Sequence, residues 1–187
     1  IKDALKLCVE CRRYEDTGTM PKVSLGVYLT FNVHVFGDIV FVDDEMFVLM
    51  TDRATRYTVI WYLMQKDYEQ LEKAFRRGWI RRFGPPRFII VDAERALAFE
   101  AFGLWCKSRA IERKIYTSQG DHAALGILNC KCRIFQRAFP ALRDTLTSVD
   151  PNIEAEDVGA ELEIAMNTQH TYGGKSPPRV CHRNVAE

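Results

Sequence analysis

The chain has 187 residues, of which 47% are hydrophobic and 27% are charged, and its net charge is +1. This composition is typical of an ordinary globular protein, and the length suggests one domain with a short appendage. No stretch approaches the roughly 18 consecutive apolar residues of a membrane span, and any basic surface must come from local clustering of charge.

Six cysteines occur along the chain, and the N-terminal residues lack the apolar run of a secretory signal. We therefore expect reduced thiols in an intracellular protein rather than a disulfide framework. The first residue is Ile1 and not Met, so we expect the sequence to be a fragment or the product of an incomplete reading frame.

Three apolar runs follow a turn-rich lead-in at residues 1–30. Residues 34–42, 46–52 and 57–64 are rich in β-branched and aromatic side chains and are separated by short polar links. Such spacing predicts three strands in an antiparallel meander.

Helices and strands alternate in the next part of the chain. Residues 66–84 have apolar side chains every four positions and end at a glycine followed by two prolines, which predicts a helix. A buried strand is expected at 87–92, a helix at 96–110 and a strand at 111–117.

Two more helices complete the predicted elements. The first covers about 123–139, with Pro140 bending or ending its regular part, and the second covers 153–169. The order of elements predicts an α/β fold in which helices pack on a mixed sheet.

Two aspartates lie at positions that suit a metal site. Asp38 interrupts an apolar strand, and Asp92 ends the predicted strand at 87–92. If these strands are neighbours, both carboxylates meet at one edge of the sheet, where hard oxygen ligands suit Mg²⁺ or Mn²⁺. Alternatively, Asp92 caps the following helix and Asp38 bonds to a neighbouring group.

Five blocks in one order resemble the integrase core of long-terminal-repeat retrotransposons and retroviruses. The match runs from about Phe31 to Pro178, and its blocks are FNVHVFGD (31–38), MFVLMTDRATRYTV (46–59), RRFGPPRFIIVDAE (81–94), DHAALG (121–126), and Asn167 with GGKSP (173–177). The resemblance implies a ribonuclease-H-like α/β fold with a mixed five-stranded sheet, in which a three-strand antiparallel meander and two parallel strands are flanked by helices.

The resemblance also divides the chain and assigns its chemistry. Residues 1–30 would be the remnant of a zinc-knuckle region and linker, 31–180 the catalytic core, and 181–187 a tail. The implied activity is DNA integration, a Mg²⁺-dependent polynucleotidyl transfer, in which Asp38 and Asp92 are catalytic residues and metal ligands.

The family's third carboxylate is missing from its expected position. It is a glutamate with thirty-five residues between it and the second aspartate, and position 128, thirty-six residues after Asp92, is Leu128. A leucine has neither charge nor lone pair, so two aspartates would hold Mg²⁺ or Mn²⁺ weakly and we expect catalysis to be impaired. Replacement of the lost ligand by Glu94 or Asp121 remains the alternative.

Cys8 and Cys11 have the spacing of one half of a tetrahedral zinc site and resemble half of the family's zinc knuckle. No histidine precedes Cys8, so we do not expect the chain as it stands to bind Zn²⁺. Cys132, in contrast, is expected in the core.

Basic residues gather in two places. Lys131, Arg133 and Arg137 follow position 128 on a helix that the resemblance places along bound DNA, so they are candidates for phosphate contacts. The other group is expected to be a solvated helix face; it comprises Arg76, Arg77, Arg81 and Arg82.

The remaining residues of the matching blocks are expected to be architectural. Asp52 is predicted to accept bonds from its own backbone in a turn that includes Thr55, Arg56 and Tyr57. His122 is expected to pack and hydrogen-bond rather than to orient a loop over the site, and Asn167 and Ser176-Pro177 are expected to complete the core.

These observations favour an impaired integrase-like core that still binds DNA, could form a homodimer, does not bind a membrane, and works in the nucleus if it functions as an integrase. Three alternatives stay open: an active nuclease or strand transferase with a displaced carboxylate, a non-catalytic protein-interaction module, and a product without function.

Overall fold

Five strands form one mixed sheet in the computed structural model, which describes residues 30–92, 100–116 and 122–168. They are β1 (His34–Val42), β2 (Glu45–Asp52), β3 (Thr58–Tyr62), β4 (Phe88–Asp92) and β5 (Glu112–Tyr116), in the order β3-β2-β1-β4-β5. The β1–β2 and β2–β3 pairs are antiparallel, whereas β1–β4 and β4–β5 are parallel. The predicted meander with two parallel strands is confirmed.

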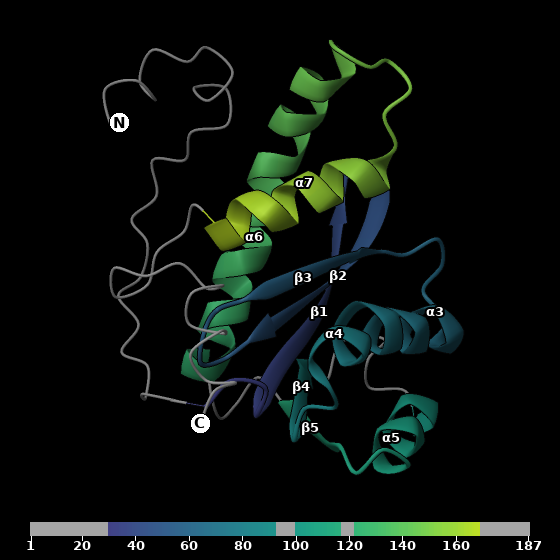
Figure 1. Cartoon of the computed structure of the whole chain (residues 1–187), viewed down its shortest axis with the longest axis vertical. Coiled ribbons are helices and arrows are strands. Elements are labelled where there is room, and N and C mark those ends of the chain that lie inside the picture. The colour runs from purple at the N-terminus through teal and green to yellow at the C-terminus, as the bar shows by residue number, and fades with distance from the viewer. Residues whose placement is uncertain (1–29, 93–99, 117–121, 169–187) are drawn as a thin grey trace.

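Helical segments cover both faces of this sheet (Figure 1). They are α3 (Tyr68–Lys73), the π-helical segment η1 (Ala74–Ile80), α4 (Arg81–Phe83), α5 (Glu100–Lys107), α6 (His122–Thr147) and α7 (Ala155–Thr168). None of the helices in the described residues is long and apolar enough to cross a membrane.

Alternate residues of β1 supply two separate cores. Val35 and Ile39 pack with α3, η1 and α5 on one face, whereas Phe36 and Val40 pack with α6 and α7 on the other. Because side chains alternate along a strand, Asp38 belongs to the face that α6 covers. Figure 1 shows α6 and α7 crossing each other, apart from α3, α4 and α5.

The predicted helix at 66–84 begins and ends as expected but has a π-helical middle. The side chain of Asp67 accepts a bond from the Gln70 backbone N–H at 2.8 Å, and Gly84 ends the helical run with a φ of +79°. In an α-helix, side chains four apart drift around the axis, and the wider π turn rotates them back. Phe75 and Trp79 therefore both reach the core, where each is fully buried.

The long helix extends beyond the predicted range of 123–139: Pro140 does not end it, and α6 continues to Thr147. A proline inside a helix removes one backbone hydrogen bond. Burial on both sides of it offsets this loss: Phe139 is fully buried, and Leu142 and Leu146 pack against the same core.

Two architectural predictions are confirmed. Asp52 accepts bonds from the Thr55 backbone N–H at 2.7 Å and hydroxyl at 2.9 Å, and it also accepts one from the Asn32 backbone at 2.9 Å. Asn167 in α7 holds the edge strand β3: its Oδ1 accepts from the Thr58 N–H at 2.9 Å, and its Nδ2 donates to the Thr58 carbonyl at 2.7 Å.

Candidate functional site

Asp38 and Asp92 lie next to each other on neighbouring parallel strands. Gly37 of β1 is in register with Val91 of β4, and each aspartate is the next residue of its strand. Parallel strands are about 4.8 Å apart, so the two carboxylates share one edge and one face. Asp38 is 5% exposed, whereas Asp92 at the end of β4 is half-buried. The expected convergence of the two strands is confirmed.

Cys132 is the residue of α6 that reaches Asp38. Its thiol donates to Asp38 Oδ2 over 3.5 Å, and its side chain is 7% exposed. The expected core position of Cys132 is therefore confirmed, and Asp38 does bond to a neighbouring group. The sequence did not predict this contact, although Cys132 lies one helical turn after Leu128 on the same face of α6.

Leu128 packs in the core on the face of the sheet that carries the aspartates. It is 1% exposed and belongs to the apolar cluster that contains Phe36 and Ile90, each two residues before one of the aspartates on the same strand face. Its place in the apolar stripe of the helix is as predicted.

The described residues do not fit a two-metal centre. No group of three or more histidine, cysteine, aspartate or glutamate side chains in this part of the chain could hold a metal ion. The donors around Asp38 are two carboxylates and one thiol, and Mg²⁺ prefers oxygen ligands to sulfur. Binding of a single Mg²⁺ or Mn²⁺ by the two aspartates stays a prediction.

Lys131 is not on the surface of α6, so its position does not suit the expected phosphate contact. Its side chain is fully buried, because position 131 follows Leu128 by three residues and turns toward the same side of the helix. The pKa of the ammonium is lowered from 10.5 to about 8, chiefly by burial and to a smaller extent by the charge of Arg56, whereas Cys130 acts in the opposite direction.

Arg133 and Arg137 lie on the outer side of α6, as their expected role requires. Arg133 is exposed and Arg137 is half-buried. They are four residues apart, so they are neighbours along one stripe of the helix surface.

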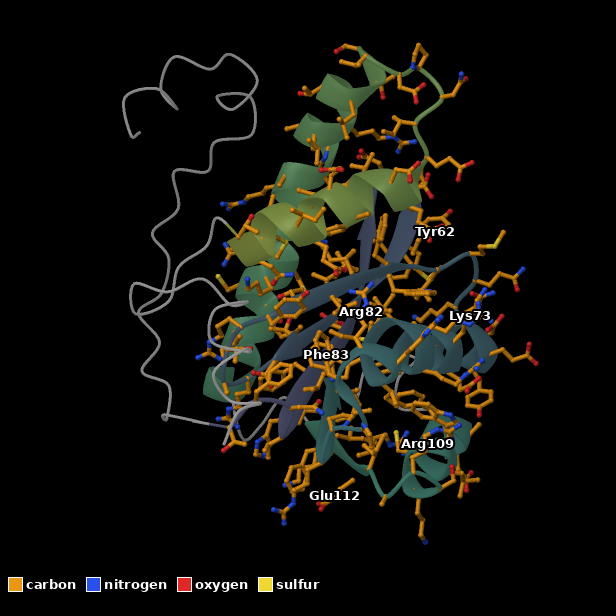
Figure 2. The ribbon with its side chains drawn as sticks, in the orientation of Figure 1. Tyr62, Lys73, Arg82, Phe83, Arg109 and Glu112 are labelled. Carbon is orange, nitrogen blue, oxygen red and sulfur yellow. The ribbon has the colours of Figure 1, made fainter. Side chains whose placement is uncertain are left out.

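The basic group on η1 and α4 is a solvated face, as predicted. All four arginines are exposed, and two of them form ion pairs: Arg76 with Glu72 at 2.9 Å and Arg82 with Glu163 at 2.6 Å. Figure 2 labels Arg82 and Phe83, which form part of α4.

Several residues singled out in the sequence lie outside the described part of the structure. They are Cys8, Cys11, Glu94, Asp121, Ser176 and Pro177, together with the side chain of His122. Whether Asp92 caps a helix is untested for the same reason, because residues 93–99 are not described.

Comparison with protein-family models finds no match, and comparison with curated proteins finds no similar sequence. Solved structures do match. A chain of the simian T-cell lymphotropic virus intasome in complex with the PP2A regulatory subunit B56 gamma has a TM-score of 0.70 and 19% identity, over 97% of this chain. This chain spans about two thirds, 66%, of that chain.

Two isolated catalytic cores also match. The HTLV-2 integrase core in complex with magnesium, in its dimeric form, has a TM-score of 0.63 and 17% identity, over 81% of this chain and 97% of that one. The BIV integrase core has a TM-score of 0.69 and 10% identity, over 83% and 97%. These likenesses show the fold: the sheet and its helices have the ribonuclease-H-like architecture of retroviral integrase catalytic cores.

Proposed function

We propose that this chain is an integrase-like core of retroelement origin that binds nucleic acid and whose catalytic centre is impaired. The observation that carries the proposal is the contact between Asp38 and the thiol of Cys132. The helix that faces the two aspartates supplies no carboxylate near them.

The composition of α6 supports this reading. From Gly126 to Thr147 its one acidic residue is Asp144. Asp144 lies twelve residues beyond Cys132, which corresponds to about 18 Å along a helix. Leucine and cysteine at positions 128 and 132 cannot replace a carboxylate that binds two cations during phosphoryl transfer.

Two positions are candidates for the lost ligand. The spacing from Asp92 favours Leu128, whereas the contact with Asp38 favours Cys132. They are one turn apart on the same face of α6, so a glutamate at either position extends toward the aspartates.

Binding of nucleic acid does not require an intact metal site. Arg133 and Arg137 on the outer stripe of α6 would contact phosphates of a duplex, with little preference for sequence. Binding of this kind weakens steeply as salt is added. In a cell it would take place in the nucleus.

The test of impaired catalysis is a strand-nicking and strand-joining assay on branched DNA with Mn²⁺. It compares the unaltered chain with Leu128→Glu and Cys132→Glu, and Asn129→Glu is the matched control because Asn129 is exposed. We expect no turnover by the unaltered chain or the control, and turnover by one of the two other variants. Thermal unfolding, with Leu128→Gln and Cys132→Gln as uncharged counterparts, shows whether each variant folds.

Other outcomes would change the proposal. Cleavage by the unaltered chain contradicts it, and loss of that cleavage in Glu94→Ala or Asp121→Ala then identifies a displaced carboxylate. If all variants fold and none cuts, the loss extends beyond the third ligand, and a role without catalysis is favoured.

A homodimerisation module is the second candidate function. Leu104 in α5 is 62% exposed and Ile115 in the adjacent strand β5 is 41% exposed, so two neighbouring elements present apolar side chains to solvent. Sedimentation equilibrium is expected to show a dimer that Leu104→Glu dissociates. A monomer at all concentrations contradicts this candidate.

A further inference from the structure

Four basic residues form a cluster at the end of the sheet away from Asp92. His34 begins β1, Arg53 follows β2, Arg87 precedes β4, and Lys114 lies in β5. We call these four residues the basal cluster. His34 and Asp38 are four residues apart on the same face of β1, so the cluster lies about 13 Å from the aspartates.

Aromatic rings hold the side chains of the basal cluster in place. The His34 ring stacks on Phe88 with 4.7 Å between ring centroids and 14° between ring planes. Lys114 Nζ lies 3.9 Å and Arg87 Cζ lies 5.0 Å from the centroid of the same ring. Arg53 Cζ lies 5.9 Å from the centroid of Phe36. Contacts of this length are cation–π interactions, which stabilise cations at the edge of a core.

The four groups act on one another electrostatically. Burial lowers the pKa of His34, and the positive charges of Arg53, Lys114 and Arg87 lower it further, in that order. The carboxylate of Glu112, 3.9 Å from Lys114 Nζ, is a solvent-exposed partner that contributes little. Bringing like charges together costs free energy, and a bound polyanion removes this cost.

We propose that the basal cluster binds the phosphodiester backbone of duplex nucleic acid, as a contact region separate from Arg133 and Arg137. This inference rests on the proposed nucleic-acid function. The cluster crosses four adjacent strands, β2, β1, β4 and β5, which corresponds to about 14 Å. The same length of duplex carries about eight phosphate charges, so a row of this width meets several phosphates at once.

The test measures how salt weakens binding of a fluorescent DNA duplex, by anisotropy over a range of KCl concentrations. The variant is Arg87→Gln with Lys114→Gln. The matched control, Arg77→Gln with Arg81→Gln, removes the same charge from exposed positions on the opposite face of the sheet. A third protein carries Arg133→Gln and Arg137→Gln.

The plot of log K against log salt has a negative slope. We expect the cluster variant to make this slope shallower by about 2, because each lost phosphate contact reduces its magnitude by about 0.9. The control is expected to keep the slope of the unaltered chain. The single variants Arg87→Gln and Lys114→Gln, each expected to remove about half of this change, serve if the double variant does not fold. Thermal unfolding checks all of these proteins.

The outcomes separate this inference from the proposed function. If the unaltered chain shows no salt-sensitive binding, both are wrong. If Arg133→Gln with Arg137→Gln makes the slope shallower but the cluster variant behaves as the control, the basal cluster is not a DNA contact and the proposed function survives. If the cluster variant loses binding to polyglutamate and keeps its DNA slope, the partner is an acidic protein, which overturns the inference.

Discussion

Lys131 shows how a single buried charge affects the stability of this fold. Its side chain is fully buried, and its pKa falls from 10.5 to about 8. The folded state therefore binds this proton less tightly than the unfolded state does. Protonation of Lys131 opposes folding, because a buried ammonium loses its hydration.

The stability of the unaltered chain is accordingly expected to depend on pH in alkaline solution. Above pH 10.5 Lys131 is neutral in both the folded and the unfolded state, so its burial carries no charge penalty. As the pH falls from there through about 8, the unfolded state takes up the proton first, and the folded state loses this stability. Lys131→Met removes this titration. We expect the variant to be more stable at pH 7 by up to about 3 kcal/mol, since one pKa unit corresponds to about 1.4 kcal/mol.

Urea unfolding of both proteins between pH 7 and 10.5 measures this difference, which should shrink as the pH rises. Lys107→Met, at an exposed position of α5, is the control and should leave the pH profile unchanged. A Lys131→Met variant that is less stable at pH 7 would show that the ammonium makes a favourable contact that outweighs its burial.

At the scale of the element, α7 protects the edge of the sheet. β3 is an edge strand, and its outward N–H groups at Thr58 and Ile60 donate to Asn167 Oδ1 and Glu163 Oε2. Glu163 also pairs with Arg82 of α4 at 2.6 Å. Covered edges of this kind cannot pair with another chain.

Asn167→Ala is expected to destabilise the fold by about 2–5 kcal/mol, because two buried backbone groups of Thr58 lose their partners. Thr168→Ala, one residue on at an exposed position, is the control and should change stability by less than about 1 kcal/mol. Urea denaturation measures both. A small loss of stability in Asn167→Ala would mean that water or another part of β3 forms hydrogen bonds to the Thr58 backbone groups after the change.

Most elements could be predicted from the sequence, because periodicity and turn residues are local signals. The strands around Asp38 and the end of the helix at Gly84 follow from such patterns. The continuation of α6 past Pro140 could not, because burial of Leu142 and Leu146 by distant parts of the chain outweighs the local effect of the proline. The π-helical turn of η1 could not be predicted either, because it depends on which side chains of this segment pack against the sheet.

At the scale of the whole molecule, the sheet brings together residues that are distant in sequence. The parallel β1–β4 pair places Asp38 beside Asp92, which was predictable once the two strands were expected to be neighbours. Two features were not predictable: the contact between Asp38 and Cys132, and the burial of Lys131. Both depend on how α6 is rotated against β1. The basal cluster was missed because its four residues come from four separate segments.

We propose that this fold binds DNA without cutting it. The most direct measurement titrates the unaltered chain against labelled branched DNA in Mn²⁺ at several salt concentrations and then runs the bound DNA on a denaturing gel. We expect binding that weakens steeply with salt and DNA that stays intact. Cut or joined strands, or no binding at low salt, would contradict it.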